Sequence, residues 1–201
     1  MAVSTQTVPQ TISPPLTSEF IWRLSVEQYH KMIVADILTE DDPIELLEGI
    51  LVTKMPKNPP HSLVTQLVRD ALARLISLGW CVNAQEPITL VDSEPEPDVA
   101  VVRGERRHYA KRHPGAQETA LVVEVAHTTL SRDRGLKKRV YATAGVPTYW
   151  IINLKDRRIE VYSEPSGSDY QRRQDYDADA EVPVILDGQE VGRLAVRELL
   201  P

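Results

Sequence analysis

One acidic residue stands where the surrounding sequence is apolar. Glu124 lies within residues 121–126, a continuous apolar run that is typical of a strand covered on both faces of a sheet. An ionised carboxylate buried alone is costly, so this side chain must be protonated, paired with a cation or bound to a metal. The alternative is a glutamate that faces a solvent-filled sheet edge, or one that pairs with an arginine purely for structure.

A second carboxylate, Asp98, begins another strand-like stretch. Pro97 cannot donate a hydrogen bond to a sheet, so the strand predicted over residues 98–102 starts at the aspartate. An aspartate at such a position is often only a turn residue. Two carboxylates from adjacent strands can also converge on Mg²⁺, which takes oxygen ligands and retains waters that a phosphate can displace.

A lysine follows on the next predicted helix. Asp133, Lys137 and Tyr141 are spaced i, i+4 and i+8, which places them on one helix face. The spacing alone favours an exposed Asp–Lys pair. The functional interpretation directs Lys137 toward the two carboxylates, where its ammonium could stabilise charge on a pentacovalent phosphorus or orient an attacking water.

Two further residues are candidates for the same site. Glu48 lies within the apolar residues 46–50, so the burial argument made for Glu124 applies to it. His61 stands near the start of a long predicted helix, either as a surface histidine or as an acid/base or positioning group.

Other chemistries are excluded by missing motifs. The chain has no glycine-rich phosphate loop, no Gly-x-Ser-x-Gly elbow and no His-Glu-x-x-His sequence, which removes the common kinase, serine hydrolase and zincin classes. The single cysteine, Cys81, excludes an internal disulfide and any multi-cysteine zinc site.

The helices and strands that must position these residues are predicted from the spacing of apolar residues and from the glycines and prolines that end regular structure. Helices are predicted over 25–38, 63–76 and 131–144. Strands are predicted over 45–52 (one strand, or two that meet at Gly49), 80–91, 98–102, 121–126, 148–153 and 158–162. Residues 170–201 suggest a hairpin and a short helix at 193–200. This order predicts an α/β fold, a mixed α+β arrangement around one central sheet.

Length and charge define the broad class. We expect a flexible leader over residues 1–19 and a single domain over 20–201. No apolar run is long enough to cross a membrane and no secretory signal is evident, so a cytoplasmic location is expected. The net charge of −6 counts against coating of nucleic acid, although basic residues within 103–112 and 132–139 could form a local basic face.

Several short motifs, taken in order, resemble the Uma2 family. They occupy residues 45–49, His61 after a proline-containing loop, and residues 97–102, 122–125, 133–137, 141–142 and 145–153, so the resemblance covers about residues 22–163. The family is assigned to the PD-(D/E)xK nuclease superfamily. The resemblance therefore implies a restriction-endonuclease-like fold, a central mixed sheet flanked by helices, and Mg²⁺-dependent (or Mn²⁺-dependent) hydrolysis of phosphodiester bonds.

The resemblance also implies roles for individual residues. Asp98 matches the aspartate of the superfamily motif and Glu124 its second acid. The usual lysine two positions later is replaced by Ala126, and Lys137 on the following helix is the natural substitute. The resemblance also implies that Glu48 is a supporting metal ligand and that His61 assists the reaction.

These observations lead to a hypothesis and its rivals. The leading hypothesis is a metal-dependent endonuclease that acts on DNA, with a homodimer expected because two-fold symmetry suits two cuts on a duplex. The rival is a catalytically inactive protein that kept the nuclease fold for binding or as a scaffold, which the acidic net charge and Ala126 favour. A nuclease that acts on RNA or branched DNA is not separated from the first hypothesis.

Overall fold

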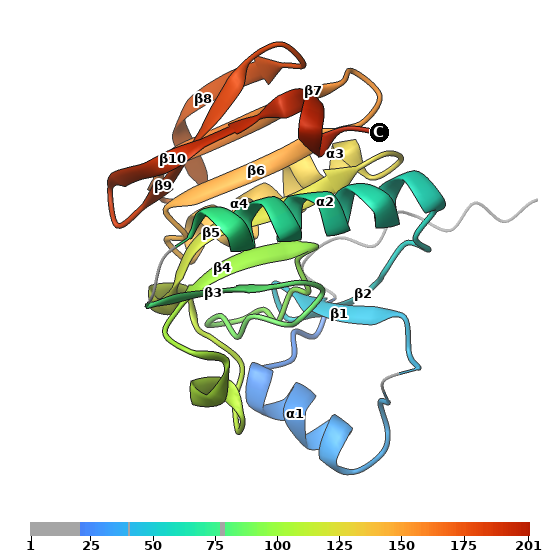
Figure 1. Ribbon diagram of the computed structural model, residues 1–201. Coiled ribbons are helices and arrows are strands. Elements are labelled where there is room, and N and C mark those ends of the chain that lie inside the picture. Colours follow the sequence, from blue (N-terminus) through green and yellow to red (C-terminus); the bar gives the residue numbers. More distant parts are fainter. Residues whose placement is uncertain (1–20, 40, 77–78) are drawn as a thin grey trace, which may run out of the picture.

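The computed structural model describes residues 21–39, 41–76 and 79–201, and the leader predicted over residues 1–19 lies outside them. A six-stranded sheet forms the centre of the molecule, in the order β3-β4-β5-β6-β7-β8 (Figure 1). Only β5 and β6 are parallel, and the other neighbours pair antiparallel. The strands are β3 (Trp80–Asn83), β4 (Val99–Arg103), β5 (Thr119–Ala126), β6 (Thr148–Asn153), β7 (Arg158–Ser166) and β8 (Asp169–Asp177). The predicted mixed α+β fold is confirmed.

One face of this sheet is covered by α2 (Pro59–Leu75) and by the hairpin of β9 (Glu181–Leu186) and β10 (Gln189–Ala195). Asn58 caps the helix by accepting a hydrogen bond from the amide of His61, and Pro59 suits the first helical position. Val64, Val68 and Leu72, at helical spacing, form the apolar stripe that packs on β4 and β5.

The opposite face is covered by the connection between the parallel strands β5 and β6. It comprises α3 (Leu130–Arg132), one π-helical turn, η4 (Asp133–Lys137), and α4 (Lys138–Thr143). Figure 1 shows α3 and α4 on the far side of the sheet from α2. Four tyrosines pack here, which makes this half of the core aromatic: Tyr141, Tyr149, Tyr162 and Tyr170.

The N-terminal part adds a helix and a small hairpin. Helix α1 (Val26–Val34) opens with the capping box that Ser25 and Gln28 predict. Strands β1 (Ile44–Leu47) and β2 (Ile50–Thr53) are joined by Glu48 and Gly49, which have φ of 49° and 74° and so form a tight turn of the hairpin type. Short 3₁₀ turns complete the chain at Arg106–Tyr109, Ala116–Glu118 and Val196–Leu199.

Some predicted boundaries were wrong. The helix expected to reach residue 38 ends at Val34, and the strand expected over 80–91 ends at Asn83. Beyond Asn83, Gln85 has a φ of 58° and Pro87 has no amide hydrogen, so neither suits a regular ladder. Within residues 170–201, for which a hairpin and a short helix are predicted, the structure has the β9–β10 hairpin and the 3₁₀ turn Val196–Leu199. Residues 169–177 add edge strand β8 to the central sheet. No helix in the described part of the chain is long and apolar enough to span a membrane.

Candidate active site

Asp98 and Glu124 are brought together by the register of two neighbouring strands. In the antiparallel pair β4–β5, Val99 lies opposite Val123, so extending the register by one residue sets Asp98 opposite Glu124. Both valines face α2, and strand alternation therefore directs both carboxylates to the side of α4. Asp98 Oδ2 accepts a hydrogen bond of 2.8 Å from the amide of Val125, which orients the aspartate along the end of the ladder.

His61 reaches the same carboxylate from α2. Its Nε2 lies 3.0 Å from Asp98 Oδ2, and both side chains are largely buried. The Asn58 cap sets the first turn of the helix, so the position of the ring follows from a local feature of the sequence. Its Nδ1 is buried and makes no hydrogen bond with any described residue.

Lys137 is buried between two carboxylates. Its Nζ lies 2.6 Å from Glu45 Oε2 and 3.1 Å from Glu124 Oε1, and only 2% of its side chain is exposed. The exposed pair with Asp133 that helical spacing favours is therefore absent, and both residues are buried instead. Burial alone would lower the pKa of Lys137, but the carboxylates of Glu124 and Glu45 raise it above its ordinary value.

The acid that the early hairpin contributes is Glu45 rather than Glu48. Glu45 is 2% exposed and also accepts a hydrogen bond of 3.2 Å from the amide of Glu96. Glu48 lies in the turn, where its side chain is 26% exposed and pairs with Arg139 at 2.5 Å, so the structure does not bring it to the pocket. The apolar neighbours of Glu48 predicted burial, but a tight turn at Glu48–Gly49 reverses the chain there.

Two residues that share the helix face of Lys137, Tyr141 and Asp133, also lie at this site. Tyr141 donates a hydrogen bond of 2.6 Å to Glu124 Oε1. Asp133 lines the same pocket and accepts a bond of 2.6 Å from the hydroxyl of Thr129. The i, i+4, i+8 spacing of Asp133, Lys137 and Tyr141 places all three on one helix face, but spacing alone does not tell whether that face points into the protein or toward solvent.

The chain also matches a known protein family along most of its length. The model of the Uma2 family, described as "Putative restriction endonuclease", matches residues 26–197. The chain belongs to the Uma2 family. No curated protein matches it.

A solved structure shares the fold of this Uma2 chain. It is described as a "putative nuclease belonging to DUF820" from Anabaena variabilis, and it is 18% identical in sequence. The match covers 88% of this chain and 97% of the other, with a TM-score of 0.63. At this identity the likeness shows a common fold and does not by itself show a common reaction.

Several carboxylates line the pocket of the Uma2 chain together with lysines, an arginine and two histidines. Burial, together with the carboxylates of Asp98, Asp133 and Glu45, raises the pKa of Glu124 to about 8, against the lowering effect of Lys137. Burial also raises the pKa of Asp133 to about 6. A group of acids that raise one another's pKa gains stability from any added positive charge.

The residues of the pocket fit a hydrated divalent cation. Among the described residues, no three His, Cys, Asp or Glu side chains are grouped to enclose a metal. Mg²⁺ does not require such a group, because one or two carboxylates are enough to bind it in a protein. Waters and substrate phosphates supply its other ligands. Asp98 and Glu124 supply two carboxylates that line one pocket, and Glu45 Oε1 beside them is buried without a hydrogen-bond partner among the described residues.

Proposed function

We propose that this Uma2 protein is a metal-dependent endonuclease that hydrolyses phosphodiester bonds in DNA. The observation that supports this most directly is the meeting of Asp98, Glu124 and Lys137 at one pocket, from two neighbouring strands and the helical connection that follows. Membership of the Uma2 family and the nuclease-like fold support the same reaction class.

Asp98 and Glu124 would hold Mg²⁺ or Mn²⁺, which when bound polarises a phosphoryl oxygen and lowers the pKa of a bound water. His61 contacts Asp98 and holds its carboxylate in place beside the amide of Val125. Asp98 is thereby fixed from two sides before any ligand arrives, which reduces the reorganisation that binding would require.

Lys137 acts as a fixed positive charge. Because its pKa is raised, the amine stays protonated at neutral pH and does not serve as a base. Its role is to stabilise negative charge that develops on the phosphoryl oxygens, or to orient the attacking water. Glu45 binds the same ammonium and keeps it within reach of Glu124.

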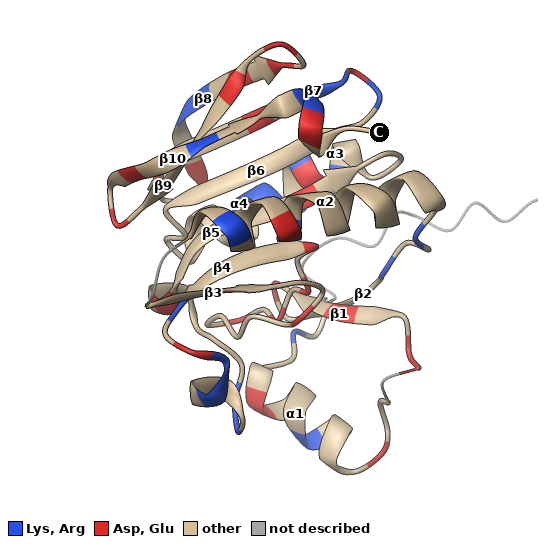
Figure 2. Cartoon of the chain, in the orientation of Figure 1, with Lys and Arg blue, Asp and Glu red and all other residues tan. Residues whose placement is uncertain are grey.

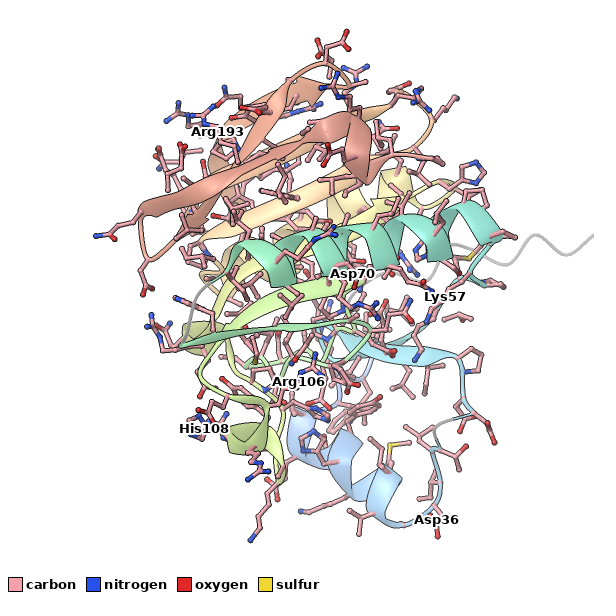
Figure 3. All side chains as sticks on the ribbon, viewed as in Figure 1. Asp36, Lys57, Asp70, Arg106, His108 and Arg193 are labelled. Carbon is pink, nitrogen blue, oxygen red and sulfur yellow. The ribbon has the colours of Figure 1, made fainter. Side chains whose placement is uncertain are left out.

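The experiment is cleavage of supercoiled plasmid DNA with Mg²⁺ or Mn²⁺, with EDTA as the metal-free control. Asp98→Asn should abolish cleavage, whereas Asp70→Asn, which changes an exposed aspartate on α2 (Figure 3), should leave it intact. Cleavage that survives Asp98→Asn would assign the activity to another site or to a contaminant. RNA and branched DNA substrates in the same assay define the substrate class.

The alternative is a nuclease fold that serves as a binding protein or scaffold. Lys137 already neutralises part of the charge of Glu45 and Glu124, an arrangement that a purely structural ion cluster would share. Absence of cleavage on every nucleic acid tested would favour this alternative. A homodimer belongs to the nuclease proposal, since two symmetric sites can cut both strands, and the mass of the protein in solution tests it.

A further inference from the structure

Most basic residues that could contact nucleic acid are already paired. Figure 2 shows Lys and Arg interspersed with Asp and Glu rather than gathered on one face in this view. Arg106, Arg107 and Lys111 form no ion pair with a described carboxylate, but they do not line the pocket of Asp98 and Glu124. Five other side chains of the same two basic stretches form ion pairs, namely Arg103–Asp187, Arg112–Glu118, Arg134–Glu160, Lys138–Asp169 and Arg139–Glu48. A phosphate would have to compete with those carboxylates, so these residues are poor candidates for binding it.

Arg132 differs from them because part of its guanidinium is unused. Its side chain lines the pocket of Glu45 and Asp98, and its NH1 donates a hydrogen bond of 2.8 Å to the carbonyl of Thr53. NH2 lies 3.8 Å from Glu45 Oε1, which is too long for a hydrogen bond. Nε is buried and has no hydrogen-bond partner among the described residues.

An arginine held in this way is suited to a phosphate. A buried N–H without an acceptor is unfavourable, and an oxyanion that reached Nε would remove that cost. The Nε and NH2 groups form the edge of the guanidinium that binds two oxygens of a phosphate side by side. The bond to Thr53 fixes the plane of the group in advance, so little side-chain freedom remains to be lost on binding.

Lys57 supplies a second positive charge at the same pocket. It is exposed on the loop between β2 and α2, near the N-terminal end of the helix (Figure 3), and no described carboxylate forms an ion pair with it. The next residue, Asn58, contacts His127 Nδ1 through its Nδ2 at 3.0 Å, which links this loop to the one after β5. Arg132 follows that second loop, so both cations lie on connected segments that border the pocket.

We propose that Arg132 and Lys57 bind backbone phosphates of the nucleic acid at the mouth of the pocket. Arg132 takes one phosphate through its Nε and NH2 edge, and Lys57 attracts another as a point charge. This inference rests on the proposed nuclease function and adds the contacts that seat the substrate beside Asp98 and Glu124. The residues within 103–112 have no part in it.

The test measures binding separately from cleavage. Fluorescence anisotropy of a labelled duplex, and of its single strand, is recorded in EDTA at several salt concentrations for the wild type and for Arg132→Ala, Arg132→Lys and Lys57→Ala. Arg107→Ala is the matched control, because Arg107 is exposed and does not line this pocket. Circular dichroism and thermal melting establish that each variant is folded.

We expect Arg132→Ala to weaken binding roughly 10- to 100-fold, as for the loss of a charged hydrogen bond. Arg132→Lys should keep the salt dependence but recover only part of the affinity, because an ammonium cannot reproduce the two-pronged contact. Lys57→Ala should lower the slope of log affinity against log salt by about 1.

Other outcomes overturn the inference and can be told apart from failure of the nuclease proposal. If the wild type binds and cuts DNA while Arg132→Ala and Lys57→Ala bind as tightly as Arg107→Ala, the phosphate contacts lie elsewhere and only this inference fails. If Arg132→Lys binds DNA as tightly as the wild type, Arg132 acts only as a positive charge, and the contact of its Nε and NH2 groups with one phosphate is refuted. If the wild type neither binds nor cuts any nucleic acid, the proposed function and this inference fail together.

Discussion

Lys137 and Glu45 form a buried ion pair of 2.6 Å across 92 residues of sequence. The pair joins the small β1–β2 hairpin to the connection between β5 and β6, and it holds the lysine against Glu124. Each of its two side chains is 2% exposed, so water does little to screen the interaction. Stability and activity should therefore depend on the same contact.

Loss of the Glu45 carboxylate should lower both stability and activity, whereas loss of the Glu48 carboxylate should change neither strongly. Removing one partner of a buried ion pair costs about 3 kcal/mol, so Glu45→Gln should lower the free energy of unfolding by roughly that amount in urea denaturation. Glu48→Gln removes a partly exposed pair with Arg139 and should cost less than about 1 kcal/mol. Equal losses in the two variants would contradict the placement of these acids.

Lys137→Met should separate catalysis from metal binding. The variant keeps a long side chain but removes the charge, and we expect plasmid cleavage to fall about 100-fold or more, as when one group that stabilises transition-state charge is lost. Mg²⁺ binding, measured by calorimetry, should persist because Asp98 and Glu124 remain. A variant that is folded and cuts at the wild-type rate would remove Lys137 from the mechanism.

Removal of the proposed divalent metal should destabilise the folded protein. A ligand that binds only the native state stabilises it by about 2.7 kcal/mol at a concentration 100-fold above its Kd. Thermal melting in Mg²⁺ and in EDTA should reveal this difference in the wild type and in Asp70→Asn. In Asp98→Asn the two melting curves should coincide, and a persistent difference would mean that Mg²⁺ binds elsewhere.

Acid stability should depend on Glu160. Burial alone would raise the pKa of this carboxyl, but hydrogen bonds from Arg134, Asn153 and Tyr162 lower it to about 2. A pKa that is depressed on folding contributes stability above the ordinary value near 4.5, and that stability is lost as the pH falls toward 2.

The size of this effect follows from the shift. We expect the ionised carboxylate to contribute on the order of 3 kcal/mol at neutral pH. Glu160→Gln should be less stable than the wild type at pH 7, and the difference should shrink between about pH 4.5 and pH 2. Denaturant titrations at a series of pH values measure it. A difference that stays constant with pH would show that Glu160 is not responsible.

The local sequence determined the long helix α2, the strand β5 and most of the other elements, although not all of their ends, and it identified which acids are unusual. The apolar stripe and proline-rich start of α2, the capping box of α1 and the uninterrupted apolar run of β5 each depend on residues a few positions apart. Glu124 stood out for the same reason, since an acid among valines is costly wherever the strand lies. Such information is present in any short window of the chain.

Only the tertiary structure decided which of these residues meet. The register of β4 on β5 sets Asp98 opposite Glu124, and the turn at Glu48–Gly49 selects Glu45 over Glu48. Lys137 changes from an apparent surface residue to a buried one because the β5–β6 connection packs its face inward. These contacts join residues up to 92 positions apart, and their geometry depends on how sheets and helices pack, which the periodicity of a single segment does not contain.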